Sequence, residues 1–173
     1  RFGFGTNAVK TTRTNLMRIG TGFDVHAFGP GTFITLGNVQ IPHHFGFVAH
    51  SDGDVLIHAI ADALLGAACL GDIGVHFPST NQKFSGISGL ELLTTVYKLI
   101  SDNHYRVINI DSTIILQSPK VSDYILEMRK KIANILKTEL GNISIKATTT
   151  DKLGFAGREE GIAAEAIVSL TRG

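Results

Sequence analysis

Apolar residues fill the segment from Asp54 to Leu70, in which Asp54, His58 and Asp62 are the only acidic or basic side chains. A helix that is apolar almost all round lies inside a protein, so the segment predicts a buried helix. The three polar residues are spaced four positions apart and therefore lie on one narrow stripe. Buried carboxylates and a buried imidazole need partners, and a metal ion suits an imidazole well. The alternative is that the stripe is the solvated face of an amphipathic helix.

The rest of the chain alternates between strand-like and helix-like patterns. We expect strands at residues 18–28, 32–41 (two short strands that turn about Gly37-Asn38), 107–116, 143–149 and 162–170, helices at 89–104 and 122–139, and loops or irregular segments at 50–53, 71–81 and 153–157. The first of these loops should supply the N-cap of the buried helix, and Ser122 should cap the last helix. This order predicts the α+β class, with a single mixed β-sheet and helices packed on one face. The other face then needs a cover, which favours an oligomer.

Composition and charge narrow the class of protein. The chain has 173 residues, of which 43% are hydrophobic and 18% charged, and we expect one domain at residues 17–173. The formal net charge of +1 includes three basic residues before residue 17, so the remainder is slightly acidic and does not fit a basic nucleic-acid binder. Polar residues interrupt every apolar stretch before about 18 residues, so no transmembrane helix is expected. The single cysteine, Cys69, excludes an intramolecular disulfide.

Residues 1–16 differ in composition from the rest of the chain, because they are basic, rich in Thr and Asn, and free of acids. This composition resembles the end of a transit peptide and indicates a plastid or plastid-like location. The alternatives are a disordered terminus or a tag remnant, with the protein in a bacterial cytoplasm.

Asp24 and His26 offer metal ligands near the end of the first expected strand. They are two residues apart, so their side chains project from the same face, about 7 Å apart. With His58 they make a set of one carboxylate and two imidazoles, which leaves one position of a tetrahedral site open, as in catalytic zinc sites. An Asp-x-His tripeptide is common by chance. Asp54 and Asp62 could orient the His58 imidazole, or they could serve only as caps and local backbone partners.

Hydroxyl groups and a carboxylate gather at residues 146–151, where a strand is expected to end. Thr148, Thr149 and Thr150 suit phosphate oxygens, and Asp151 suits a hard cation such as Mg²⁺ that bridges phosphates. The alternative is that the Thr run reflects only the preference of Thr for edge strands.

Three further segments could meet other parts of a phosphorylated ligand. His50 and Ser51 lie at the entry of the buried helix, whose N-terminus attracts anions. Asp72, in the tight turn 71–74, could accept hydrogen bonds from sugar hydroxyls or merely satisfy the turn. Lys120 follows a strand and could meet a phosphate or a base carbonyl.

Taken together, these segments resemble the 2-C-methyl-D-erythritol 2,4-cyclodiphosphate synthase family. The matching motifs are Gly22-Phe23-Asp24-Val25-His26, residues 50–55 leading to His58-Ala59, residues 62–67, Gly71-Asp72-Ile73-Gly74, Phe77-Pro78, Pro119-Lys120, residues 146–155, Gly157-Arg158 and Glu160-Gly161-Ile162. They follow one another in the family's order from about Arg18 to Leu170, which is nearly the whole chain.

The resemblance implies a homotrimeric phosphorus–oxygen lyase of non-mevalonate isoprenoid biosynthesis, with α+β subunits. Its reaction would convert 4-diphosphocytidyl-2-C-methyl-D-erythritol 2-phosphate to 2-C-methyl-D-erythritol 2,4-cyclodiphosphate and CMP. The resemblance places Zn²⁺ on Asp24, His26 and His58, and a second divalent ion, Mg²⁺ or Mn²⁺, near Asp151. It implies no nucleic-acid or membrane partner.

The resemblance also assigns roles to individual residues, with His50 and Thr149 as the catalytic residues. The substrate-binding residues that it implies are Asp24, His26, His50, Ser51, Asp72, Ile73, Gly74, Phe77, Ser79, Asn81, Leu116, Pro119, Lys120, Ser122, Thr148, Thr149, Thr150, Asp151, Phe155 and Arg158. A central cavity of the trimer, which can hold an isoprenoid diphosphate, would be lined by Phe23, Phe155, Arg158 and Glu160. The chain departs from the family where Ser79-Thr80-Asn81 replace the usual Asp-Thr-Asp and where Asp151 replaces the commoner Glu.

Two rival functions fit parts of the same pattern. One is a zinc phosphohydrolase, which needs a positioned water and a base near the open metal position. The other is a trimer without catalytic activity that binds isoprenoid diphosphates.

Overall fold

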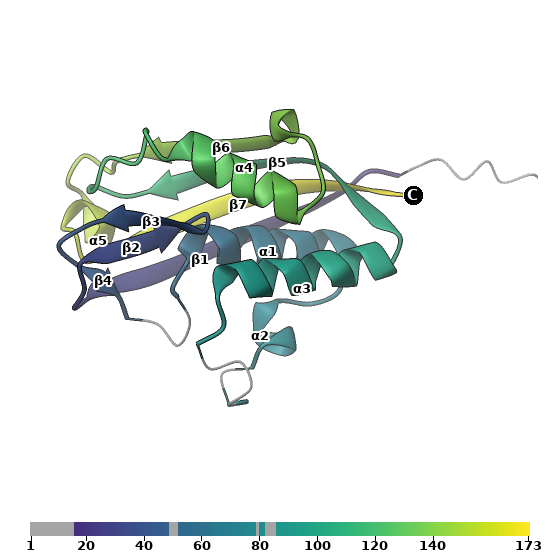
Figure 1. Ribbon diagram of the computed structural model, residues 1–173, viewed down its shortest axis with the longest axis horizontal. Coiled ribbons are helices and arrows are strands. Elements are labelled where there is room, and N and C mark those ends of the chain that lie inside the picture. The colour runs from purple at the N-terminus through teal and green to yellow at the C-terminus, as the bar shows by residue number, and fades with distance from the viewer. Residues whose placement is uncertain (1–15, 49–51, 79, 82–85) are drawn as a thin grey trace, which may run out of the picture.

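In the computed structural model, which describes residues 16–48, 52–78, 80–81 and 86–173, five strands form a central mixed sheet (Figure 1). The strand order is β4-β1-β7-β5-β6, and the pairing is antiparallel except between β5 and β6. The strands are β1 (Arg18–Gly29), β4 (Gly46–Phe47), β5 (Tyr105–Ile115), β6 (Ile143–Thr148) and β7 (Gly161–Arg172). The predicted α+β class and mixed sheet are therefore confirmed.

The expectation of a single sheet is wrong, because β2 (Phe33–Leu36) and β3 (Val39–Pro42) form a separate two-stranded sheet. Gly37 and Asn38 both have positive φ, which suits the tight turn of a hairpin. Their backbone N–H groups donate to the Asp54 carboxylate at 2.9 and 2.6 Å. The hairpin is thus tied to the start of a helix instead of pairing with the central sheet.

The main helices cover one face of the central sheet, as expected (Figure 1). Helix α1 (Val55–Ala68) packs on β1 and β7, α3 (Gly89–Asp102) packs on α1, and α4 (Ile125–Ile135) packs on β6. On the opposite face Ile19, Phe23 and Val25 of β1 and Ile167 of β7 are exposed in the described chain. None of the described helices has the length and apolar character needed to cross a membrane.

Helix α1 is the buried helix that the sequence predicts. All of its residues are buried except Asp62 and Gly66. Its N-cap is Asp54, whose side chain accepts from Ile57 N–H at 3.1 Å, so the expectation that residues 50–53 supply the cap is wrong by one position. The helix ends where Cys69 adopts the left-handed conformation and its N–H bonds back to the last turn.

Strand β1 approaches α1 unusually closely because it presents glycines to the helix. A Cβ atom at Gly22 would lie 2.0 Å from the Ala59 carbonyl oxygen, and one at Gly20 would lie 2.1 Å from that of Ala63. Side chains alternate along a strand, so Asp24 and His26 continue the same face of β1 toward the first turns of α1. This packing places two expected metal ligands opposite the third.

Several short elements differ from the predictions. Helices α2 (Ile73–His76) and α5 (Gly154–Gly157) lie in segments expected to be irregular, and the two-residue strand β4 was not predicted; all three are too short to have a readable period. Helix α4 is also shorter than the expected 122–139, and Ser122 does not cap it. Its hydroxyl donates to Asp123 at 3.2 Å instead, and a left-handed Lys137 stops the helix before the short 3₁₀ helix η2 (Leu140–Asn142).

Candidate functional site

Asp24 and His26 of β1 and His58 of α1 converge at one end of the sheet. Asp24 Oδ2 lies 3.0 Å from His26 Nε2 and 2.9 Å from His58 Nδ1, and the two histidine nitrogens are 3.1 Å apart. Among the described residues these three form a group whose ligand atoms all lie within 4.8 Å of one another. Two imidazoles and one carboxylate fit a divalent metal and leave coordination positions for another ligand. We call this group the triad.

The ionisation of Asp24 and that of His58 depend on each other. Burial disfavours the charged form of Asp24, but hydrogen bonds and charge from His26 and His58 outweigh it and hold the pKa of Asp24 well below its usual value. Burial also disfavours protonated His58, yet the bond to Asp24 and its charge raise the pKa of His58. Asp24 is therefore an ionised ligand at neutral pH. A metal ion that binds here must displace any proton held by the imidazoles.

Asp54 and Asp62, the other two polar residues of the stripe, accept hydrogen bonds from backbone N–H groups. Asp54 is fully buried and accepts three backbone N–H bonds, from Gly37, Asn38 and Ile57, while burial raises its pKa to about 6. Asp62 Oδ1 accepts the Ile73 N–H at 2.8 Å. The structure therefore gives these carboxylates backbone partners at the start of α1 and at the start of α2.

Aromatic rings that were absent from the sequence-based predictions flank the triad. The Phe47 ring lies 6.0 Å from the His26 ring, and Phe28 stacks on Phe47 at 5.8 Å with an interplanar angle of 10°. A Cβ at Gly53, which has φ +69°, would lie 2.7 Å from Phe47, so the 52–53 backbone closes over this ring. No local signal marked Phe47, because its role depends on the pairing of β4 with β1.

The turn at residues 71–74 lies next to α1. Asp72 caps α2, since its Oδ1 accepts the Val75 N–H at 2.9 Å. Gly71 has φ +89°, a conformation that favours glycine. Downstream, Asn81 N–H donates to the Pro78 carbonyl at 2.9 Å. Three residues expected at the substrate, His50, Ser51 and Ser79, lie outside the described residues.

A second group of predicted residues lines a hollow of about 330 Å³ between the end of β5, the segment before α4 and the end of β6. Its lining includes Leu116, Pro119, Lys120, Ser122, Thr148 and Thr149. We call this the β5–β6 hollow. Asp151 lies beyond it in a left-handed turn, with its Oδ1 3.5 Å from the Thr149 hydroxyl. A larger open hollow of about 960 Å³, between the β2–β3 hairpin and α4, contains no triad residue and was not predicted.

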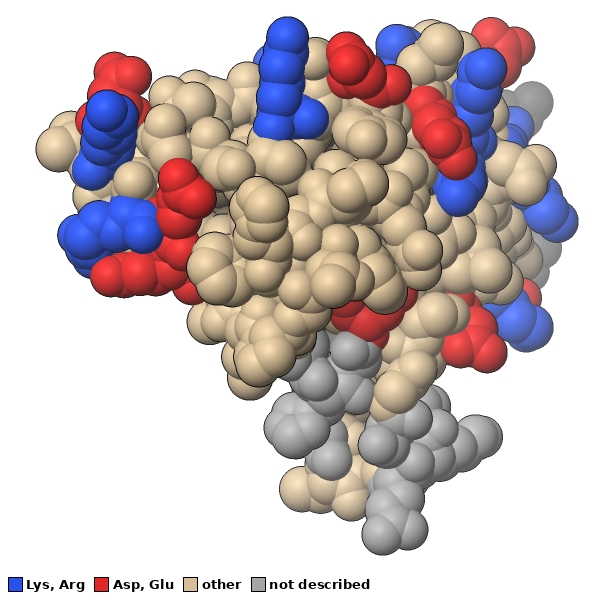
Figure 2. Space-filling model, turned by 60° about the vertical axis from the view of Figure 1, so that its left-hand side comes forward, with Lys and Arg blue, Asp and Glu red and all other residues tan. Residues whose placement is uncertain are grey.

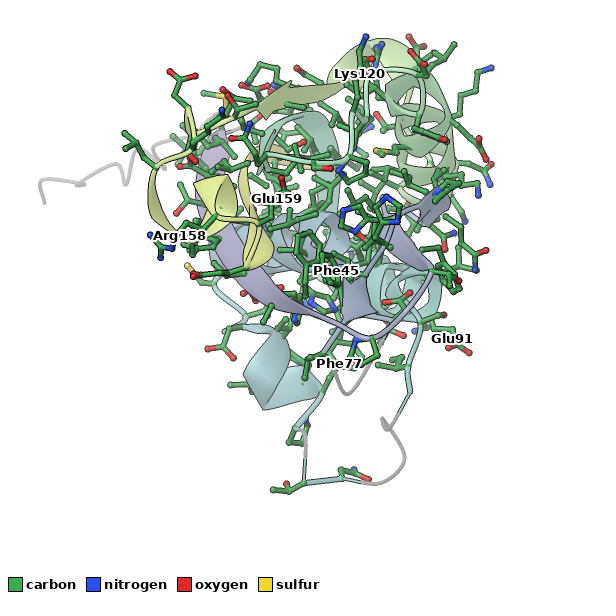
Figure 3. All side chains as sticks on the ribbon, turned by 90° about the vertical axis from the view of Figure 1, so that its left-hand side faces the viewer. Phe45, Phe77, Glu91, Lys120, Arg158 and Glu159 are labelled. Carbon is green, nitrogen blue, oxygen red and sulfur yellow. The ribbon has the colours of Figure 1, made fainter. Side chains whose placement is uncertain are left out.

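None of the three triad residues lines the β5–β6 hollow. In Figure 3, Lys120 of the β5–β6 hollow and Phe77 of the segment after α2 lie at opposite ends of the same side, with Phe45 between them. Arg158 lies at the left-hand edge of this side, and Glu159 lies further in. Arg158 donates to both carboxylate oxygens of Glu160, at 2.9 and 3.0 Å, which raises the pKa of Arg158 and lowers that of Glu160.

The surface charge is mixed. Figure 2 shows basic and acidic side chains interspersed around the edges of one face, with a broad uncharged surface between them. This face presents no concentrated basic patch of the kind that binds nucleic acid.

Comparison with known proteins places the chain in a family. The model of the YgbB family matches residues 17–171. The 2-C-methyl-D-erythritol 2,4-cyclodiphosphate synthase of Ectopseudomonas mendocina is 58% identical, with 90% of this chain and 99% of the relative covered. The synthase of Acinetobacter baumannii is 56% identical, with 90% and 97% covered.

Solved structures agree with this result. The bifunctional IspDF of Campylobacter jejuni superposes with a TM-score of 0.89 and 44% identity over 92% of this chain, which spans 43% of that longer protein. A Plasmodium falciparum IspF complex with CDP has a TM-score of 0.80 and 33% identity, with 92% of this chain and 98% of that chain covered. The family resemblance of the sequence motifs is thus confirmed, and the chain belongs to the YgbB family as a relative of the 2-C-methyl-D-erythritol 2,4-cyclodiphosphate synthases.

Proposed function

We propose that this protein converts 4-diphosphocytidyl-2-C-methyl-D-erythritol 2-phosphate to 2-C-methyl-D-erythritol 2,4-cyclodiphosphate and CMP, in non-mevalonate isoprenoid precursor biosynthesis. The observation that carries the proposal is the convergence of Asp24, His26 and His58 into a metal-binding group in a chain 58% identical to a synthase of this name. The reaction class is a phosphorus–oxygen lyase.

The metal that we propose for the triad is Zn²⁺, because two imidazoles and one carboxylate are ligands that zinc prefers. Bound there, Zn²⁺ would act as a Lewis acid toward an oxygen of the β-phosphate. The protein's part is to hold the three ligands in place. His58 does so from a buried helix that packs directly on β1, the strand that carries Asp24 and His26.

The remaining residues would position the substrate. Phosphoryl transfer depends mainly on alignment and charge stabilisation, and the attacking 2-phosphate is already an anion at neutral pH, so the reaction needs no general base. His50, Ser51 and Thr149 would hold phosphate oxygens. Asp72 would accept from the ribose hydroxyls, and Lys120 with the rest of the β5–β6 hollow would hold the cytosine and its phosphates. Folding the substrate so that its two ends meet supplies the entropic part of the rate enhancement.

We propose that the site is completed by a second copy of the chain in a homotrimer. Two observations support this: no triad residue lines the β5–β6 hollow, and the sheet face that carries Ile19, Phe23 and Ile167 lacks a cover within the described chain. Asp151, whose carboxylate reaches less far than the usual Glu, would help to hold a second divalent ion, Mg²⁺ or Mn²⁺, which would stabilise the negative charge of the phosphates.

Two further proposals concern the surroundings of the enzyme. The central cavity of the trimer, lined by Phe23, Phe155, Arg158 and Glu160, would accept an isoprenoid diphosphate; Phe23 and Phe155 are 59% and 38% exposed in one chain. For location, the two synthases compared above come from bacteria and favour the bacterial cytoplasm over the plastid. The segment that suggested a plastid is residues 1–16, of which 1–15 lie outside the described chain.

Phosphorus NMR with the CDP-linked substrate tests the proposed reaction against its rivals. We expect signals of the cyclic diphosphate and of CMP, and their loss when the metal is chelated. A linear product would identify a phosphohydrolase. Absence of CMP release, together with uptake of an isoprenoid diphosphate, would identify a binding protein without catalytic activity.

A further inference from the structure

Asp62 lies on α1 one helical turn beyond His58, about 6 Å further along the helix axis. A carboxylate at that position is well placed to orient the His58 imidazole, which is one role that the sequence suggested for it. The structure instead pairs its Oδ1 with the Ile73 N–H at 2.8 Å, across 11 residues of chain. His58 makes its polar contacts within the triad, with Asp24 and His26.

Ile73 is the first residue of α2 and follows Asp72 directly. Asp72 caps the same short helix, and the Phe77 N–H closes it by donating to the Ile73 carbonyl at 2.7 Å. A four-residue helix has little stability by itself, so its position depends on contacts with its surroundings. The bond from Asp62 ties its first peptide to the helix that carries His58.

Charged groups from two parts of the site act on Asp62. Burial raises the pKa of Asp62, and the hydrogen bond from the Ile73 N–H opposes that rise. The charges of Asp72 in the turn and of Asp24 in the triad raise the pKa further, whereas His58 lowers it. Asp62 therefore interacts with both the Asp72 turn and the metal triad of the proposed site.

We propose that Asp62 is a positioning residue that fixes the Asp72–Gly74 turn relative to the metal triad. This inference rests on the proposed function, in which that turn holds the ribose of the substrate. Asp62 acts on substrate affinity through its hydrogen bond to the Ile73 peptide, whereas it reaches the triad only through its charge.

The test uses the zinc-loaded protein and two variants at one position. Asp62→Ala removes the acceptor, and we expect KM for the CDP-linked substrate to rise about tenfold, the loss typical of a hydrogen bond to a charged group. Asp62→Asn keeps an oxygen that can accept the Ile73 N–H, so its KM should stay within about twofold of the wild type. Zinc affinity, measured by chelator competition, should be the same in the Ala and Asn variants, because both remove the same charge. Amide exchange at Ile73 should be faster only in the Ala variant.

Glu91→Ala provides a matched control, because Glu91, like Asp62, is a carboxylate that accepts a backbone N–H at the start of a helix, here from Ser88 at 3.2 Å in the capping box of α3. It should leave KM unchanged. A weakened zinc site in Asp62→Ala with unchanged KM would overturn the inference, and so would unchanged KM with unchanged exchange at Ile73. Failure of the proposed function is distinguishable, because wild-type protein would then release no CMP while the exchange comparison still reports on the turn.

Discussion

The triad and the β5–β6 hollow differ in how completely one chain builds them. The side chains of Asp24, His26 and His58 lie within hydrogen-bonding distance of one another. They are carried by a buried helix and by the glycine-containing strand against which it packs. The hollow collects its predicted residues from two strand ends and a loop, and none of the triad residues lines it. The triad has the geometry of a metal site within one chain. In our proposal the β5–β6 hollow becomes a complete binding site only with a neighbouring copy.

This difference has a physical reason. Metal affinity requires ligand atoms to be held within tenths of an ångström, and close backbone packing provides that rigidity. A nucleotide presents a large and mainly polar surface, which several weaker contacts can hold. A defect in one region should therefore change metal affinity, whereas a defect in the other should change substrate affinity.

His58→Ala should have the largest effect on the triad and on activity. It removes one of three ligands, so we expect loss of zinc loading and of CMP release. The proposed trimer should stay assembled, because His58 lies on α1 and the uncovered sheet face is on the other side. Metal analysis, product assay and size-exclusion chromatography measure the three properties. Full activity in demonstrably zinc-free variant protein would refute the metal assignment.

Gly22→Ala tests whether the close approach of β1 and α1 builds the triad. The new Cβ would lie 2.0 Å from the Ala59 carbonyl oxygen, so strand and helix must separate. We expect a loss of about 1–3 kcal/mol in the free energy of unfolding, as for other overpacked cores, together with weaker zinc binding. Gly141→Ala is the control, because nothing lies within 4 Å of its added Cβ. Equal zinc affinity in the two variants would show that the close packing of β1 against α1 does not determine metal binding.

Lys120→Ala tests the other region. Loss of a charged donor from the hollow should raise KM by about tenfold and leave zinc affinity unchanged. Substrate titration of the zinc-loaded variant gives the first quantity and chelator competition gives the second. A change in zinc affinity would contradict the separation of the two regions.

The smallest effect is expected from the ion pair of Lys146 and Asp111 on β6 and β5. Hydrogen bonding to Lys146 lowers the pKa of Asp111 below its usual 3.8. The pair therefore stabilises the fold above that pH and loses its contribution as the pH falls. Both side chains are about half exposed, at 53% and 46%, so Lys146→Met should cost only about 0.5 kcal/mol or less at pH 7.

Urea unfolding of both proteins at pH 7 and near pH 3 measures the effect of the ion pair. The difference in unfolding free energy should shrink at the lower pH. A difference that grew with acidity would show that Lys146 acts through some other contact.

The amino-acid sequence by itself determined the elements with strong periodicity and the kinds of chemistry available. The apolar run of α1, the alternation of β5 and the ligand types at Asp24, His26 and His58 can all be read directly. Each reflects local side-chain composition, which the backbone periods of 3.6 and 2 residues translate into faces. The same reading missed α2, α5 and β4, because they are too short to show a period and, unlike the equally short β2 and β3, are not marked by a turn such as Gly37-Asn38.

Only the tertiary structure decided which polar residues meet. Asp24 and His58 are 34 positions apart and come together because glycines let β1 lie against α1. Asp54 and Asp62 share the stripe with His58, yet their carboxylates pair with backbone N–H groups of the β2–β3 turn and of α2. Periodicity shows that a side chain is buried, whereas the identity of its partner depends on the distance and angle between packed elements.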